Sequence, residues 1–335
     1  MTMDVEQAED PSKTGFFEVA TLNCEHFAYR QEYGPERPGR YRGNAGEYQR
    51  KVDLAAAIAG HLQPYIPRAP QDEYTAKFRK QELAAVVLLQ EVEGDLIPFL
   101  EQIALVYGTE NICVRRYSKH IDRTHCVLNY EDPEHYLAVI ANVPIKSVFA
   151  QEQETENGLA GYGAFGVSTT DGAHWFVSAH IKWGVLGQEQ TRRLCRSLAK
   201  QFFEHEEIKS IVLGGDFNGP ISFVLGENGE RLSVEVDGQM VLAEELKDPD
   251  SMQWLPLQRS KRISESVLSW LPHCSSDDGK FVTRPSSTDE HDKYIDHVFV
   301  WSKTPCYISA YELRPMKDAS DHEMVTVRVG LTNVV

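Results

Sequence analysis

Acidic, amide and imidazole side chains recur at the ends of apolar, strand-like stretches of this chain. The clearest case is the run 211–218, in which apolar residues and two glycines lead into Asp216 and Asn218. The glycines let the backbone approach a neighbour closely, and a buried strand would deliver both polar side chains to one edge of a sheet. Many α/β proteins place an aspartate there, so this run by itself identifies no chemistry.

Further polar clusters stand at or beside other strand-like ends. They are Asn23 with Glu25, Glu91, His180, and Asp296 with Asp321 and His322. Alternating strands and helices can bring such ends to one edge, where they share a site. Carboxylate and amide oxygens favour Mg²⁺ or Mn²⁺ over zinc. A hard cation there would neutralise phosphate charge and activate water. The pattern therefore predicts a metal-dependent site that acts on phosphate esters.

The elements that must position these groups follow from apolar runs and helical spacings. We expect strands over 16–22, 84–89, 210–215, 293–301 and 324–329, several strands between 111 and 148, and a hairpin of 162–168 with 174–180. Helices are predicted over 47–61, 95–106 and 188–206. One domain is expected over 15–335, after a disordered tail at 1–14 and with inserts near 63–80 and 219–290. The stretch 219–287 shows no regular pattern.

Composition narrows the class of protein. The chain has 335 residues, a formal charge of −16 and 41% hydrophobic residues, enough for a sizeable core. The negative charge argues against broad binding to nucleic acid and suits a cation-binding enzyme. Six scattered cysteines without a C-x-x-C pair argue against zinc or disulfides and favour a cytoplasmic location. No signal peptide and no membrane-spanning apolar run is expected.

The polar clusters carry a resemblance to a known group of enzymes. The chain resembles the endonuclease/exonuclease/phosphatase superfamily, which is DNase I-like, and within it the bacterial nuclease-type members. The matching motifs are TLNCE at 21–25, LLQEV at 88–92, VSAH at 177–180, LGGDFN at 213–218, YIDHVFV at 294–300 and SDH at 320–322. They stand in the order of the family and span nearly the whole chain.

The resemblance implies a fold, an activity and a cofactor. The fold would be a four-layer α/β sandwich, with two mixed β-sheets packed face to face and helices outside. The activity would be that of a phosphoric ester hydrolase that uses Mg²⁺ or Mn²⁺, and the nuclease-type members cleave phosphodiester bonds of DNA or RNA. Glu91 would be the principal metal ligand, assisted by Glu25 and Asp321, and Asn23 would help to hold the metal shell or the phosphate.

The remaining polar residues would take catalytic roles by the same resemblance. Asp216 and Asn218 would orient the attacking water and bind the scissile phosphate. His322, oriented by Asp296, would be a general base or a phosphate contact. A carboxylate on one imidazole nitrogen fixes the tautomer and raises the pKa. His180 would stabilise the phosphorane or assist the leaving group. Whether Asp216 or His322 takes the proton of the water stays open.

Basic and aromatic residues outside these motifs are candidates for substrate binding. Arg115 and Arg116 could contact a phosphate backbone or belong to a solvated hairpin. Lys182 and Trp183 could touch phosphate and stack on a base, or form a packed rim. Arg42 lies in the loop after the first strand, where it could face substrate.

Two other functions compete with a nuclease. A phosphomonoesterase or a lipid or small-molecule phosphodiesterase, inositol-phosphatase- or sphingomyelinase-like, could use the same scaffold. Here Gly219-Pro220 follows the Asp-x-Asn pair, where the inositol-phosphatase branch usually has an aromatic and a basic residue. A catalytically silent binding module is the second alternative. The charge favours a short, single-stranded or nucleotide-like phosphodiester substrate, and no obligate protein partner is inferred.

Overall fold

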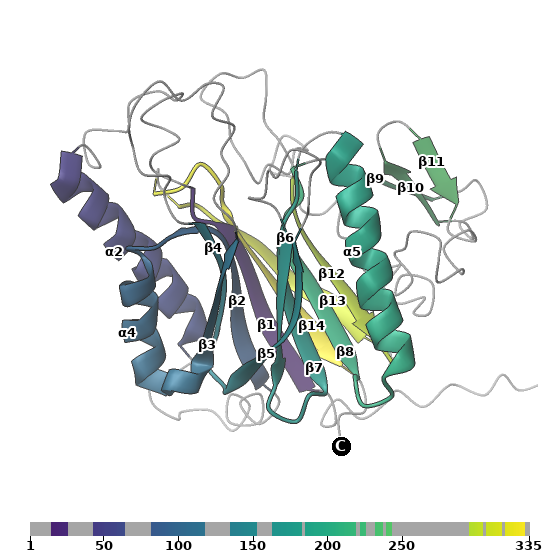
Figure 1. Cartoon of the computed structure of the whole chain (residues 1–335), viewed down its shortest axis with the longest axis horizontal. Coiled ribbons are helices and arrows are strands. Elements are labelled where there is room, and N and C mark those ends of the chain that lie inside the picture. The colour runs from purple at the N-terminus through teal and green to yellow at the C-terminus, as the bar shows by residue number, and fades with distance from the viewer. Residues whose placement is uncertain are drawn as a thin grey trace, which may run out of the picture.

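Two β-sheets pack face to face in the computed structural model of the chain, and helices cover their outer faces (Figure 1). Helices α2 and α4 lie on one side of the pair of sheets and α5 lies on the other (Figure 1). The predicted four-layer α/β sandwich is confirmed. The structure describes residues 15–25, 43–63, 82–117, 135–152, 163–182, 185–218, 222–225, 232–236, 239–242, 295–303, 306–316 and 319–331.

The larger sheet has the strand order β13-β14-β1-β2-β4-β3. Its strands are β1 (Gly15–Asn23), β2 (Glu82–Glu93), β3 (Ile112–Tyr117), β4 (His135–Ala141), β13 (Cys306–Arg314) and β14 (Met324–Leu331). The second sheet has the order β12-β8-β7-β6-β5. Its strands are β5 (Ile145–Glu152), β6 (Gly163–Thr169), β7 (His174–His180), β8 (Ser210–Asp216) and β12 (Asp296–Ser302).

Each of these sheets contains one parallel pair of strands that a helix connects. Helix α2 (Gly43–Leu62) joins β1 to β2, and α5 (Val185–Glu204) joins β7 to β8. Parallel neighbours need such a crossover, which returns the chain to the same end of the sheet. The carboxyl ends of β1 and β2 therefore lie together, and so do those of β7 and β8. Helix α4 (Ile97–Tyr107) and a short 3-10 helix, η3 (Thr109–Asn111), follow β2.

Strand β2 shows how the sequence builds the layers. Its residues are almost all apolar, as expected for a strand that is buried on both faces. Val86 and Leu88 belong to the core between the two sheets. Val87 and Leu89, one position along, belong to the core that includes Leu54 of α2. The alternation follows from the two-residue period of a strand and makes β2 the spine of the larger sheet.

The structure corrects several predictions from the sequence. It shows an additional strand, β13. Within the stretch where the sequence shows no regular pattern, it shows a small antiparallel sheet of β9 (Ser222–Leu225), β10 (Leu232–Val236) and β11 (Gln239–Leu242). Helix α2 begins at Gly43, earlier than expected, and α5 ends at Glu204. The hairpin of β6 and β7 is confirmed.

Some predictions fall outside the part of the chain that the structure describes. They concern the tail at 1–14, nearly all of the insert at 63–80, most of the insert at 219–290, and residues Arg42 and Trp183. Among the described residues, no helix combines the length and the apolar character needed to cross a membrane. Cys24 and Cys113 carry free thiols.

Candidate active site

Three polar residues stand side by side at one end of the five-stranded sheet. His180, the last residue of β7, pairs in register with Asp216, the last residue of β8. Asp216 pairs in turn with Asp296, the first residue of β12. Neighbouring strands are only about 5 Å apart, so strand register alone gathers an imidazole and two carboxylates.

The two glycines before Asp216 make this register possible. Gly214 faces the larger sheet, and a Cβ there would lie 2.8 Å from Cδ1 of Leu88. Gly215 has a φ of +157°, and a Cβ there would lie 1.9 Å from the carbonyl oxygen of Ala179 on β7. No side chain fits that space. The predicted role in close backbone approach is therefore visible at Gly215, whereas Gly214 makes room for the side chain of Leu88.

The larger sheet reaches this group through Asn23. The Nδ2 atom of Asn23 donates hydrogen bonds of 3.0 Å to Oε1 of Glu91 and of 3.0 Å to Oδ2 of Asp216. Its Oδ1 atom accepts the backbone N–H of Glu25 at 2.9 Å. That N–H fixes which end of the amide faces the carboxylates, because it can only donate. Asn23 thus joins the ends of β1, β2 and β8.

Backbone strain concentrates at this end of the molecule. Among the described residues, the non-glycine residues with positive φ are Glu25 (51°), Glu91 (49°) and Asn218 (50°). Glu91 lies in the irregular part of β2, where its register against β4 shifts between Leu89 and Val92. Such conformations are uncommon for glutamate and persist only when the surroundings enforce them. Strain of this kind, confined to one end, is typical of a functional site.

His322 lies within reach of three carboxylates. Its Nδ1 atom is 2.9 Å from Oδ2 of Asp296. Its Nε2 atom is 3.7 Å from Oδ2 of Asp216 and 3.7 Å from Oδ1 of Asp321. The loop that carries it is tied to β1, because the Ser320 hydroxyl donates a 2.6 Å hydrogen bond to the carbonyl oxygen of Asn23.

These contacts shift two pKa values in the direction that proton transfer needs. Burial raises the pKa of Asp216 to about 7; His322 opposes this shift and Asp296 adds to it. Burial alone would lower the pKa of His322, but Asp296, and after it Asp321 and Asp216, raise it to about 10. The geometry therefore favours an imidazolium at His322 and a proton acceptor at Asp216.

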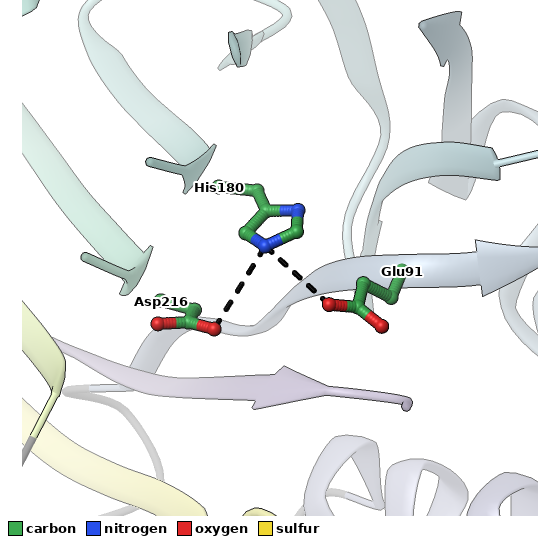
Figure 2. Close-up of side chains that lie close together, drawn as sticks. All are labelled: Glu91, His180 and Asp216. Atoms are coloured by element: carbon green, nitrogen blue, oxygen red, sulfur yellow. Dashed lines mark ion pairs between the residues drawn. The ribbon is translucent and has the colours of Figure 1, made fainter. Parts of the chain in front are cut away.

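Two overlapping groups of side chains offer ligand atoms close enough to hold a cation. Glu91, His180 and Asp216 form one group, and Asp216, Asp296 and His322 form the other. Figure 2 shows the His180 imidazole between the carboxylates of Glu91 and Asp216, with Nε2 at 3.4 Å and 3.9 Å from them. Carboxylates outnumber imidazoles here, and this donor set fits Mg²⁺ or Mn²⁺.

Glu91 and Asp321 stay accessible although their neighbours are buried. The Glu91 side chain is 23% exposed and the Asp321 side chain is 17% exposed. Asn23, Asp216 and Asp296 are almost fully buried. A charged ligand can therefore reach the acidic group from one side, while the protein fixes the other side.

A buried polar bridge joins the two sheets directly below Glu91. The Nε2 atom of Gln90 donates to the Ser178 hydroxyl at 2.8 Å, and that hydroxyl donates to the carbonyl oxygen of Leu89 at 2.9 Å. The Thr21 hydroxyl donates to Oε1 of Gln90 at 3.3 Å. Hydrogen bonds in such a dry interior are costly to leave unmade, so the bridge fixes the sheets relative to each other.

The structure brings together all nine residues predicted for metal binding and catalysis. They form one continuous set of contacts: Asn23, Glu25, Glu91, His180, Asp216, Asn218, Asp296, Asp321 and His322. Asn218 closes the set, since its backbone N–H donates to Oδ1 of Asp216 at 2.7 Å and its Nδ2 to the carbonyl oxygen of Ile181 at 2.9 Å.

The predicted substrate-binding residues are less tightly grouped. Arg115 is exposed and lies near the end of β3, and Arg116 pairs with Tyr136 of β4. Tyr136 also pairs with Val92, the neighbour of Glu91, so β3 presents its arginines at the same end of the sheet as Glu91. Lys182 follows β7 closely.

The sequence reasoning assigned no role to four polar residues that hold this site. Gln90 and Ser320 lie inside recognised motifs, next to residues that did receive a role. Gln190 of α5 accepts the backbone N–H of Lys182 at 2.9 Å. Arg50 could have been noticed, because it lies four residues before Leu54 on the apolar stripe of α2, where a charge is unusual.

Comparison with known proteins places the chain in a family. A profile described as the Endonuclease/Exonuclease/phosphatase family matches residues 20–322. No protein among curated sequences matches the chain.

Solved structures share the fold at low sequence identity. An endonuclease/exonuclease/phosphatase from Beutenbergia cavernae is 18% identical over 95% of this chain and 72% of its own, with a TM-score of 0.54. ANGEL2, described as a 2′,3′-cyclic phosphatase, is 12% identical over 95% of this chain and 96% of its own, with a TM-score of 0.52. The human Nocturnin catalytic domain with bound sulfate is 14% identical over 95% of this chain and 98% of its own, with a TM-score of 0.51.

Proposed function

Because the chain belongs to the endonuclease/exonuclease/phosphatase family, we propose that it is a divalent-metal-dependent phosphodiesterase that cleaves phosphodiester bonds of DNA or RNA. One observation carries the proposal. Carboxylates from the two sheets converge on one accessible edge, where His322 lies between Asp296 and Asp216. An ordinary surface cluster needs no such arrangement, since it would leave its carboxylates in solvent.

The acidic residues would hold Mg²⁺ or Mn²⁺. Glu91 would be the principal ligand, assisted by Asp321 and Glu25. Asn23 would act on the ligand shell indirectly, because its Nδ2 atom donates to Glu91 and Asp216 while its oxygen is occupied by Glu25. When bound, the ion supplies neutralisation of phosphate charge and polarisation of the scissile P–O bond.

The buried pair beside the ligands would handle the proton. Asp216 would accept it from the attacking water, because burial raises the pKa of its carboxyl to about 7. His322 would keep its own proton and stabilise the added negative charge on the phosphate, with Asp296 fixing the orientation of the imidazole. Asn218, held rigidly against Asp216, would bind a phosphate oxygen, and His180 would assist at the leaving-group side.

The substrate would be short or single-stranded nucleic acid, or a nucleotide-like diester. The chain carries a net charge of −16, so a long duplex would be repelled except where Arg115, Arg116 or Lys182 contact it. These residues are proposed to bind the phosphates that flank the cleaved bond. Trp183, the next residue in the sequence after Lys182, and Arg42 are proposed to contribute as well.

The proposal is tested by nicking of supercoiled plasmid and cleavage of single-stranded oligonucleotides with Mg²⁺, with Mn²⁺ and with excess chelator. We expect activity in both metals, none with chelator, and a loss of about 100-fold or more for Asp216→Asn and for His322→Ala. His174→Gln is the matched control. His174 is a buried histidine at the opposite end of β7, where it contacts the Ser210 hydroxyl and the ring of Phe17.

Two outcomes would reject the assignment. If Asp216→Asn and His322→Ala keep the activity of His174→Gln, the converged residues do not perform the reaction. If bis-(4-nitrophenyl) phosphate is untouched while 4-nitrophenyl phosphate is turned over, the chain is a monoesterase. A 2′,3′-cyclic nucleotide, assayed beside the oligonucleotides, separates a small diester substrate from a polymer.

A further inference from the structure

Arg50 is a buried charge that the proposed reaction does not use. It lies in the second turn of α2 and is only 1% exposed. Burying a guanidinium is expensive unless every donor finds an acceptor. Burial lowers the pKa of Arg50, but the hydrogen bond and charge of Glu47, with Glu93 and Glu25, more than offset this and raise it above its ordinary value. The residue therefore remains a cation, and its contacts show where that cation acts.

One nitrogen of Arg50 contacts two segments that are far apart in the sequence. Its Nη1 atom donates to the carbonyl oxygens of Cys24 at 2.8 Å, Glu25 at 3.2 Å and Ala319 at 3.2 Å. The first two belong to the end of β1, and the third begins the loop that leads to β14. Carbonyl oxygens of a regular strand would be paired within the sheet, so these contacts belong to the irregular ends.

The other nitrogens of Arg50 anchor it in an acidic setting. Nε donates to Oε1 of Glu47 at 2.7 Å, and Nη2 donates to Oε2 of Glu93 at 2.8 Å. Glu93 lies two residues after Glu91 on β2. A single guanidinium thus touches the ends of β1 and β2 and the loop before β14, the three places from which the expected metal ligands come.

The two end segments, 23–25 and 319–322, also contact each other. The backbone N–H of Asp321 donates to Oε2 of Glu25 at 2.9 Å. The Ser320 hydroxyl bridges the segments, because it donates to the carbonyl oxygen of Asn23 and accepts the N–H of His322 at 3.1 Å. Glu25 holds this position with a φ of +51°, a conformation that its own preferences do not favour. Arg50 adds a contact from outside the two segments, because it bonds to the carbonyl oxygen of Glu25.

We propose that Arg50 is a positioning residue that couples the two end segments, so that Glu25 and Asp321 are held together and ready to bind a divalent cation. Only the binding of a divalent cation rests on the proposed function. The coupling of the two segments does not depend on it. Lysine cannot replace Arg50, because its single ammonium group lacks the planar set of donors that binds three carbonyl oxygens and two carboxylates here. Arg50→Lys is therefore the informative variant, with the charge kept and the geometry lost.

Lys51 provides a control from the same acidic group. Its Nζ atom pairs with Asp95 and lies 3.7 Å from Oε1 of Glu47 and 3.9 Å from Oε2 of Glu93. It shares two acidic partners with Arg50 but none of the carbonyl oxygens of the end segments. Lys51→Met should thus disturb the ion network without releasing the segments.

The first measurement is hydrogen exchange by mass spectrometry on the metal-free chain. We expect Arg50→Lys to speed exchange in peptides covering 23–25 and 319–322 together by about tenfold or more, while Lys51→Met leaves both unchanged. If Arg50→Lys leaves both segments protected, or releases only one of them, the coupling is wrong. Should Arg50→Lys fail to fold, Glu93→Gln replaces it, because it removes the ionic anchor of the fork. Release of both segments is again expected, and protection of either again overturns the coupling.

The second measurement is Mn²⁺ binding by calorimetry on the same proteins, well below their unfolding temperature. Arg50→Lys should bind Mn²⁺ about tenfold or more weakly than wild type, and Lys51→Met should match wild type. If Arg50→Lys and Lys51→Met weakened Mn²⁺ binding equally, Arg50 would act only as a member of a structural ion network. If wild type takes up no Mn²⁺, the proposed function fails, and the exchange experiment still decides whether Arg50 couples the segments.

Discussion

The two connected pairs of parallel strands, β1–α2–β2 and β7–α5–β8, have the same topology and deliver their ends to the same place by different means. In the second unit, strand register alone sets His180 beside Asp216. In the first unit, the end of β1 and the irregular part of β2 carry the expected metal ligands, and Arg50 of α2 contacts both segments.

The difference extends to the residues that adopt positive φ. The second unit places Asn218 there, a residue type that tolerates this conformation. The first unit places Glu25 and Glu91 there, for which it is uncommon. The half of the site that strand register builds needs space for backbones that approach closely. The half that strained strand ends build needs groups that enforce the strain. Substitutions in the two units should therefore differ in their effects on stability and on metal binding.

The largest effect is expected from Gly215→Ala in the second unit. The new Cβ would lie 1.9 Å from the carbonyl oxygen of Ala179, so β7 and β8 would have to separate. We expect a loss of more than about 4 kcal/mol in the free energy of unfolding, measured by urea denaturation. Gly172→Ala is the control, because Gly172 also has positive φ but its nearest neighbour, Nζ of Lys146, is 3.9 Å away. Equal costs for the two variants would refute a requirement for space.

The next effect separates the units by metal affinity. Glu91 of the first unit and His180 of the second belong to the same group of ligand atoms. Because the anionic ligand gives more to a divalent cation, Glu91→Gln should weaken Mn²⁺ binding about 100-fold, or about 3 kcal/mol, and His180→Gln about tenfold. Calorimetry measures both. If His180→Gln weakened Mn²⁺ binding more than Glu91→Gln, the cation would lie closer to the second unit than we propose.

A third effect concerns pH and the far end of α2. The Nε2 atom of His61 lies 3.3 Å from the carbonyl oxygen of Glu18, which ties α2 to β1. Burial lowers the pKa of His61 to about 4, so the unfolded chain binds a proton that the folded chain does not between about 6.5 and 4. Its contribution is present above pH 6.5 and is lost as the pH falls through that window.

The pH effect is measured as the free energy of unfolding of wild type and His61→Gln at pH 8 and pH 5. We expect wild type to lose about 2 kcal/mol more than the variant between these two values. Parallel behaviour of the two proteins would show that the imidazole of His61 takes up a proton without unfolding.

The smallest effect tests whether the second unit depends on its helix. Gln190 of α5 accepts the backbone N–H of Lys182, just beyond His180. Its Nε2 atom is buried without a hydrogen-bond partner, so replacing the amide by an apolar side chain forfeits one bond only. Gln190→Met should cost about 1 kcal/mol in unfolding free energy and leave Mn²⁺ affinity unchanged. If Gln190→Met weakened Mn²⁺ binding as much as Arg50→Lys, α5 would support the metal site to the same extent as α2.

The sequence predicted best those features that local pattern encodes. The apolar run of β2, the glycines before Asp216 and the hairpin of β6 and β7 were all found, because strand period and turn chemistry act over a few residues. The order of the polar motifs indicated which ends should share a site. Which end of the Asn23 amide faces the carboxylates could not be predicted, since it depends on hydrogen bonds of the folded chain.

The sequence predicted poorly those features that depend on distant contacts. Strand β13 lies at the edge of its sheet, and its register against β14 shifts between Ser309 and Glu312, which interrupts the alternating pattern. A charge on the apolar stripe of α2 marks Arg50 as unusual, but its acceptors could not be predicted, because they are mainly backbone oxygens from 25 to 269 residues away that no residue pattern signals. Local sequence patterns predict the expected ligands, but the groups that hold those ligands in place depend on tertiary structure.

The pairing of β1 with β14 has a consequence for biosynthesis. Thr21 lies opposite Val325, and the Ser320 hydroxyl binds the carbonyl oxygen of Asn23, 297 residues earlier in the chain. Strand β1 can pair with β2 early in synthesis, but its other edge stays unpaired until β14 is made, and such long-range pairing is slow. Polypeptides that lack residues 319–331 should therefore lack the contacts that hold the candidate site together.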